Sequence, residues 1–304
     1  MSDFVRQNGT EAAFTASESW VILSPIEQSI KRKIEAAGVP LKDWDINIYR
    51  GVLTGYNEAF IISTEKRNEI LANCASPEER ARTEELIRPI LRGRDIKRYG
   101  YDWAGLYLIA TFPSRHYNIE EFPAVKEHLL SFGIERLEQT GKEYIVDGKK
   151  IKARKKTNNK WFETQDSISY WDDFSKPKIA WPSVGATEYS LIPEGYILLD
   201  TNYFLTCSSP RNLLAFLNSS LIVWWINSED TQLGTGGAWR HYKYNLEKLC
   251  VPAYNKDLDI FISKILSSRN YYDKESIDMI NEKVFEIYNL DNEEIKFILS
   301  QHNQ

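Results

Sequence analysis

Residues 46–62 read INIYRGVLTGYNEAFII, two short apolar runs separated by residues typical of a turn. Ile46 and Ile48 begin the first run, and Ala59–Ile62 reads as a second short strand. Residues 55–58 (GYNE) have turn chemistry, because glycine permits a positive φ and asparagine tolerates one. The pattern predicts a β-hairpin at this point of the chain.

Helical patterns flank this stretch. Ser24-Pro25-Ile26-Glu27 is typical of a helix start, because Ser24 caps, Pro25 takes the first helical position and Glu27 completes a capping box. We predict an irregular segment at 1–20, further helices at 65–73, 76–87, 119–138, 210–225, 257–269, 274–288 and 291–301, and strands at 106–111, 178–181, 189–192, 196–199 and 203–206. The fold class expected is α+β, with a helical lead-in and a helical C-terminal bundle around a strand-rich middle.

Composition is typical of a globular protein. The chain has 304 residues, of which 42% are apolar and 27% charged. No apolar run reaches the roughly 18 residues of a membrane helix, so we expect no membrane partner. Three cysteines without a CxxC pair indicate neither a disulfide framework nor a cysteine zinc site, and the chain is expected in the cytoplasm.

Charge is segregated along the chain. The net charge of −5 by itself argues against a nucleic-acid partner. Residues 148–162 (GKKIKARKKTNNKWF), however, contain seven cations and no acid, and residues 88–98 (RPILRGRDIKR) contain five cations and one acid. Residues 256–304 hold more acids than bases and are expected to pack against protein. Such segregation produces a field with a direction.

Catalytic signatures are sparse. The sequence has no GxSxG, GxxxxGK[ST] or GxGxxG motif, and no D/N-P-P-Y/F motif of amino-methylating DNA methyltransferases. Asp147-Gly148-Lys149 and Glu294-Ile295-Lys296 match the D/E-x-K element of nucleases, but such triplets arise by chance in a chain this rich in charge. We therefore assign no catalytic residue and no metal ligand.

Three stretches together resemble one protein family. Residues 49–60 (YRGVLTGYNEAF) resemble its G-[IV]-x-T-G-x-N-x-A-F element, and residues 87–99 (IRPILRGRDIKRY) resemble its P-x-[LI]-[RK]-G-[RK]-D-[IV] element. The third stretch is dispersed over 176–179, 214–219 and 240–252. The chain is identified by this resemblance as a target-recognition domain of type IIG restriction-modification enzymes and adenine-specific DNA methyltransferases, the TaqI-like C-terminal specificity domain.

The resemblance implies a reader of DNA rather than a catalyst. A methyltransferase domain of the parent polypeptide would use S-adenosylmethionine, and this chain would need no cofactor of its own. Residues 45–255 would form the recognition domain, after a lead-in at 1–44 and before a helical subdomain at 256–304. The chain is then expected to be a C-terminal portion of a longer enzyme, with double-stranded DNA and the methyltransferase domain as partners.

The DNA-binding residues follow from two kinds of contact, because cations on phosphates position a protein and side chains on base edges read sequence. For residues 149–156 a solvated loop is the alternative, and for 92–98 a structural role in which Arg94 or Asp95 ties down the loop after Pro89. Asn57 either reads adenine or caps its own turn. The candidates are Asn57, Arg92, Arg94, Lys97, Arg98, Lys149, Lys150, Lys152, Arg154, Lys155, Lys156, Arg240 and Lys243.

Two other functions stay open at this point. The first is a protein-interaction accessory module of a multisubunit complex, with a surface rich in tryptophan and tyrosine facing other subunits. The second is a small nuclease acting through metal-dependent cleavage. Binding of duplex DNA that weakens steeply with salt favours the recognition domain, salt-insensitive association with a protein partner and no DNA retention favours the interaction module, and metal-dependent DNA cleavage by this chain alone would favour the nuclease.

Overall fold

The computed structural model describes residues 23–268 and 273–301. The chain forms two compact units, and the predicted α+β class is confirmed. Unit 1 comprises Met1–Trp44, Arg211–Asp230 and Tyr242–Gln304, and unit 2 comprises Asp45–Pro210 and Thr231–His241. Residues 211–230 and 242–255 thus group with the terminal helices, although the sequence analysis placed them in the recognition domain. The functional division at 44/45 and 255/256 stays a prediction.

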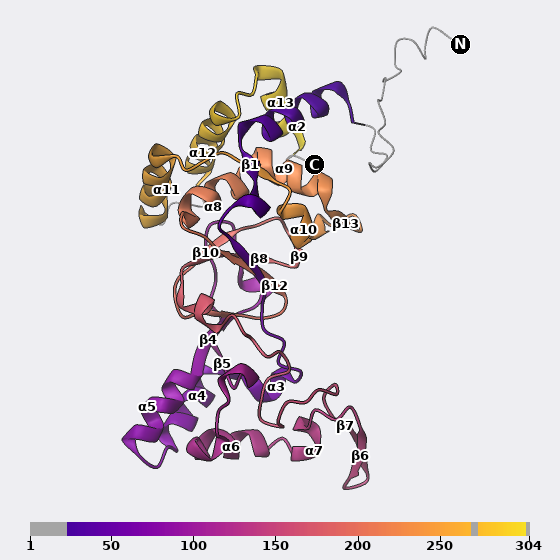
Figure 1. The fold of residues 1–304 in the computed structure, drawn as a ribbon, viewed down its shortest axis with the longest axis vertical. Helices are drawn as coiled ribbons and strands as arrows, with labels where there is room; N and C mark the ends of the chain where they lie inside the picture. Colours follow the sequence, from indigo (N-terminus) through magenta and orange to yellow (C-terminus); the bar gives the residue numbers. More distant parts are fainter. Residues whose placement is uncertain (1–22, 269–272, 302–304) are drawn as a thin grey trace, which may run out of the picture. The chain divides into compact units, whose positions relative to one another are not determined.

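Unit 1 is mainly helical (Figure 1). Its elements are α2 (Pro25–Ala37), β1 (Val39–Pro40), most of α8 (Pro210–Asn218), α9 (Ser220–Glu229), α10 (Lys243–Leu246), β15 (Cys250–Val251), α11 (Lys256–Ser268), α12 (Lys274–Ile287) and α13 (Asn292–Gln301), with β1 antiparallel to β15. The predicted capping box is confirmed, since Ser24 Oγ accepts from Glu27 N and Glu27 accepts from Ser24 N. The predicted irregular segment at 1–20 lies outside the described residues.

The helix predicted at 210–225 is in fact two helices. Ser219 ends α8 and caps α9, because its hydroxyl accepts from the backbone N–H of Ile222 and donates to the carbonyl of Phe216. A serine side chain that bonds to nearby backbone groups competes with helix continuation. Trp224 and Trp225 of α9 are buried.

Unit 2 contains two four-stranded sheets. The first has the order β10-β8-β12-β2 and is antiparallel, with β10 (Ser190–Ile192), β8 (Lys178–Pro182), β12 (Asn202–Thr206) and β2 (Asn47–Arg50). The second has the order β11-β4-β5-β3, with β11 (Ile197–Leu198), β4 (Ile87–Leu91), β5 (Leu106–Ile109) and β3 (Ile61–Ser63). One hydrophobic core, including Val52, Phe60, Ile90, Leu108 and Phe204, joins them.

The hairpin predicted at 46–62 is wrong. Its two strands belong to different sheets, because β2 pairs with β12 and β3 pairs with β5. Residues 57–60 form the short helix α3 (Asn57–Phe60), which buries Ala59 and Phe60 in the core instead of extending the second strand. Burial of two apolar side chains on one helical turn outweighs the local hairpin pattern.

Helices and two small sheets complete unit 2. The helices are α4 (Thr64–Ala72), α5 (Pro77–Leu86), α6 (Pro123–Leu130) and α7 (Ile134–Leu137). One small sheet has the order β13-β14-β9, with β13 (Thr231–Leu233), β14 (Ala238–Arg240) and β9 (Val184–Gly185), and the other is the hairpin of β6 (Glu143–Val146) and β7 (Lys149–Lys152). Within the described ranges, every helix is too short or too polar to cross a membrane.

Candidate nucleic-acid interface

A groove of about 600 Å³ in unit 2 brings together stretches that are far apart in sequence. Asn57 lines it from the start of α3, and residues 92–97 line it from the turn after β4. Pro182, residues 184–186 and Glu188, around β9, contribute most of the remaining lining, and Leu199 and Thr201 complete it. Four of the predicted DNA-binding residues are therefore neighbours: Asn57, Arg92, Arg94 and Lys97.

Arg92 and Asp95 form a clamp within the turn. The Asp95 carboxylate accepts from Arg92 N at 2.8 Å, from Nε at 2.9 Å and from Nη2 at 2.7 Å. This pairing raises the pKa of Arg92, and Asp95 itself is buried. The backbone around Gly93 is equally constrained, because a side chain there would approach the carbonyl oxygen of Thr201 to 3.1 Å. The structural role that the sequence left open for this segment thus falls to Arg92 and Asp95.

Arg94 and Lys97 remain available to a ligand. Arg94 is exposed and makes no ion pair with any residue of 23–268 or 273–301. Lys97 is half-buried, and its Nζ donates to the carbonyl of Arg94 at 3.1 Å. Arg98 does not line the groove; its guanidinium lies over the Tyr99 ring, 5.6 Å from the centroid. The segment thus offers the groove two cations held at a defined turn.

Asn57 is oriented by its own loop. Thr54 Oγ1 accepts from the N–H of Tyr56 at 3.1 Å, so its single proton is donated to Asn57 Oδ1, at 2.6 Å. The exposed amide then presents its Nδ2 donor and the second lone pair of Oδ1. A capped turn and a base-reading amide are therefore compatible at this residue.

Glu188 is a groove residue that the sequence analysis missed. Burial raises the pKa of its carboxyl, and the neighbouring Lys97 and Arg98 oppose that rise. No motif marks it, because a lone glutamate in a loop has no periodicity or spacing to distinguish it. A carboxylate here can accept a hydrogen bond from the amino group of cytosine.

Arg240 lies on the groove side of the small sheet. Arg240 of β14 pairs with Val184 of β9, and Val184 lines the groove. Paired residues of antiparallel strands share a face, so the exposed Arg240 side chain lies on the same face of the small sheet as Val184, although it does not itself line the groove. Lys243 belongs to unit 1, where its Nζ lies 3.5 Å from the carboxylate of Glu247.

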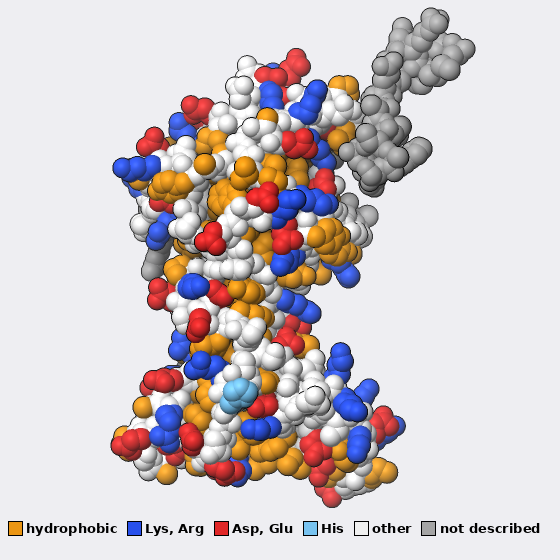
Figure 2. Space-filling model, viewed as in Figure 1, with side chains coloured by type: hydrophobic (Ala, Val, Ile, Leu, Met, Phe, Trp, Pro, Cys, Tyr) orange, Lys and Arg blue, Asp and Glu red, His pale blue; other side chains and the backbone are white. Residues whose placement is uncertain are grey.

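The run at 149–156 begins as one strand of a hairpin. Asp147 and Gly148 form its tip with φ of 48° and 74°, the conformation that a two-residue turn of this kind requires. Folding places Glu143 opposite Lys152, and its carboxylate pairs with Lys150 at 2.7 Å. Figure 2 shows acidic side chains among the basic ones over β6 and β7. The cations are therefore partly neutralised in space, although no acid interrupts them in sequence.

Arg154 has a different role from the one predicted. It is only 4% exposed, and its guanidinium donates to the carbonyls of Leu137, Thr54, Glu163 and Trp161 at 2.6–2.9 Å. Burial lowers its pKa to about 10, which leaves it charged at neutral pH. A guanidinium whose donors are bound to carbonyls cannot also clamp a phosphate, so Arg154 is a framework residue. Lys149, Lys152, Lys155 and Lys156 are exposed.

The two nuclease-like triplets contain residues that stabilise the fold. Asp147 and Gly148 make the hairpin turn described above. Glu294 is buried in unit 1, where it accepts from Ser29 Oγ at 2.7 Å and from Lys33 Nζ at 2.6 Å. Across residues 23–268 and 273–301, no three His, Cys, Asp or Glu side chains are grouped so as to hold a metal ion.

Comparisons with known proteins show a shared fold. No protein-family model matches the chain, and neither does any curated protein. Among solved structures, the type IIL restriction-modification enzyme MmeI in complex with DNA is similar with a TM-score of 0.53 and 12% identity, over 86% of this chain and 36% of that one. The type IIG restriction endonuclease BpuSI has a TM-score of 0.48 and 12% identity, over 87% of this chain and 33% of that one. The chain thus spans about a third of each, and its fold is that of part of a restriction-modification enzyme.

Proposed function

We propose that this chain recognises double-stranded DNA as the specificity domain of a restriction-modification methyltransferase, with the adenine-specific methylation carried out by another part of the protein. The observation that carries the proposal is the groove of unit 2, which Asn57, Arg94 and Lys97 line from separate stretches, with Arg240 paired to the lining residue Val184. The likeness in fold to a restriction-modification enzyme that was solved with DNA supports it.

The chemistry of the lining suits base edges. An arginine fork matches the two acceptors of guanine, and an asparagine amide matches the donor and acceptor of adenine. The groove volume of about 600 Å³ is in the range of pockets for small ligands, so it would engage a short part of a duplex rather than its whole width. The exposed lysines of the 149–156 run would add contacts to phosphate.

Binding to randomised duplexes tests the proposal. The full chain is titrated with a labelled pool of short duplexes at salt from about 50 to 200 mM, and bound sequences are selected and read. We expect affinity to fall steeply with salt, by roughly 0.9 log units per log unit of salt for each phosphate contact, and a sequence preference to emerge. Absence of retention at low salt, or salt-insensitive association with a protein partner instead, would count against DNA recognition.

A further inference from the structure

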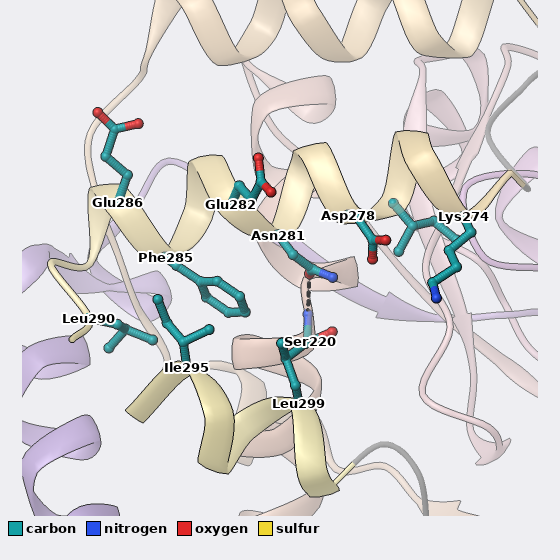
Figure 3. Close-up of a pocket in the computed structure, with 11 residues that line it drawn as sticks. Ser220, Lys274, Asp278, Asn281, Glu282, Phe285, Glu286, Leu290, Ile295 and Leu299 are labelled. Carbon is teal, nitrogen blue, oxygen red and sulfur yellow. Dashed lines mark hydrogen bonds between the residues drawn. The ribbon is translucent and has the colours of Figure 1, made fainter. Parts of the chain in front are cut away.

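A second groove, of about 810 Å³, lies in unit 1 between α12 and α13 (Figure 3). Its floor is apolar and consists of Ile277 and Phe285 from α12, Leu290 from the connection, and Ile295 and Leu299 from α13. Phe285 is buried at the floor, whereas Leu299 is 41% exposed at the edge. None of the predicted DNA-binding residues lines this groove.

One polar atom at the bottom of the groove already has a hydrogen-bond partner. Asn281 is buried, and its Oδ1 accepts from the backbone N–H of Ser220 at 2.8 Å, which joins α12 to the first turn of α9. A ligand therefore needs no polar partner for this oxygen. The floor as a whole selects apolar side chains.

The rim of the groove is acidic. Asp278, Glu282 and Glu286 recur every four residues along α12, and Lys274 is the one cation among the described lining residues. Like charges one helical turn apart destabilise a helix. Of the three acids, only Glu286 has an ion pair with another described residue, Lys283 at 2.9 Å. Repulsion along the stripe destabilises α12, and among the described residues it is offset by an ion pair only at Glu286, which favours a cationic ligand at the rim.

The charge of the rim decides between occupants. A nucleic acid or an anionic lipid surface would face three carboxylates. A second copy of this chain, packed across a two-fold axis, would bring one acidic stripe against the other. An amphipathic helix with apolar side chains on one face and lysine or arginine beside them satisfies both the floor and the rim.

We propose that the α12–α13 groove docks a cationic amphipathic helix of another protein segment. The 14 residues of α12 span about 21 Å, so the occupant would contribute three to four helical turns. Its apolar residues at i, i+3, i+4 and i+7 would enter the floor, and its cations would pair with Asp278, Glu282 and Glu286. The inference does not depend on DNA recognition, because the two grooves share no residue.

A pair of synthetic peptides tests the floor and the rim together. Both peptides are stapled as helices, so that the free-energy cost of helix formation does not weaken binding. Both carry the same stripe of leucine residues. In one peptide lysine residues flank this stripe, and in the other glutamate residues do. Fluorescence anisotropy with the full chain should show that the lysine peptide binds about tenfold or more tightly than the glutamate peptide. Equal binding of both peptides, or binding of neither, would overturn the proposal.

Matched variants locate the site. Leu299→Asp should weaken the lysine peptide about tenfold or more, because it places a charge at the apolar edge. Met279→Asp is the control, since Met279 is on α12, the other helix of the groove, is 44% exposed and does not line the groove; it should leave binding unchanged. Equal losses in the two variants would refute a site in this groove. Circular dichroism confirms that both variants fold.

A charge swap completes the test. In the double variant Asp278→Lys/Glu282→Lys, the preference should reverse, so that the glutamate peptide binds more tightly. An unchanged preference would exclude the rim as the selecting element. Light scattering that shows a Leu299-dependent dimer would make a second copy the occupant and overturn the proposal. Duplex binding measured on Leu299→Asp should equal that of the unmodified chain, so failure of DNA recognition and failure of helix docking are told apart.

Discussion

Two basic stretches of unit 2 look alike in sequence but differ in the structure. Residues 92–98 and 149–156 each contain one arginine bound within the framework, namely Arg92 on Asp95 and Arg154 on four carbonyls. Arg94 and Lys97 of the first stretch lie at a tight turn beside a groove, whereas the second stretch begins on a hairpin in which Glu143 pairs with Lys150. The density of charge along a chain therefore does not tell which cation is free; the position of nearby acceptors does.

The difference suggests that the two stretches contact different parts of the DNA. A cation held at a defined turn can discriminate between bases, because discrimination depends on the geometry of two-point contact. The exposed lysines of the 149–156 run suit phosphate, which attracts charge without reading sequence. Four predictions, ordered from the largest expected effect to the smallest, test this contrast.

Arg154→Met should destabilise the chain by roughly 3–5 kcal/mol, because it leaves buried carbonyls without the charged donor that satisfies them. Lys155→Met, one residue away and exposed, should change stability by no more than about 0.5 kcal/mol. Urea unfolding followed by tryptophan fluorescence measures both. Equal midpoints for the two variants would show that Arg154 is not a framework residue.

A second buried cation, Lys178, should make the free energy of unfolding depend on pH. Lys178 of β8 is fully buried, with its Nζ 3.0 Å from the carbonyl of Phe174 and 3.2 Å from that of Pro193, and burial lowers its pKa to about 8. The unfolded chain keeps this proton up to its ordinary value of 10.5 and so binds more protons between these two pH values. The free energy of unfolding should therefore rise with pH above about 8, by roughly 3 kcal/mol at most, and be flat below it as far as this group is concerned.

Lys178→Met removes the group that causes this rise. Urea unfolding at intervals from pH 7 to about 9.5, below the ordinary pKa of tyrosine, should show a slope for the unmodified chain and a smaller one for the variant. Identical slopes would mean that Lys178 loses its proton at the same pH in both states. Such a result would show that burial does not perturb the Lys178 amine, unlike the Arg154 guanidinium.

Arg94→Ala should alter preference among DNA sequences, with a loss of roughly 1–3 kcal/mol in discrimination at one position. Arg240→Ala is expected to act in the same way at another position. Arg115→Ala is the control, because Arg115 is exposed but does not line the groove. Selection from randomised duplexes measures the preference. A variant that weakens all sequences alike would assign Arg94 to phosphate.

The triple variant Lys152→Ala/Lys155→Ala/Lys156→Ala should weaken binding to all sequences alike, with the smallest effect per side chain. Arg154 is left in place so that the fold is retained. The slope of the logarithm of the binding constant against the logarithm of salt concentration should become shallower by roughly 0.9 for each phosphate contact removed. A control that replaces the exposed Lys42, Lys264 and Lys296 of unit 1 removes the same charge. If both variants behave alike, net charge and not the 149–156 run would explain the loss.

Much of the local structure was predictable from neighbouring residues. The capping box of Ser24 and Glu27 and the helix start before α5 at Ser76 depend on groups within about four residues of each other. The hairpin predicted at 46–62 failed because the partners of its strands, β12 and β5, lie many residues away.

The sequence by itself determined the α+β composition, most helix starts and the segregation of charge, since each depends on residue type and short-range spacing. The tertiary structure alone decided which cations are free, because the acceptors around Arg154 come from positions as distant as Thr54 and Leu137. It also decided that Asn57, Arg94 and Glu188 share a groove. Contacts between residues so far apart follow from packing of the core, and no local pattern encodes them.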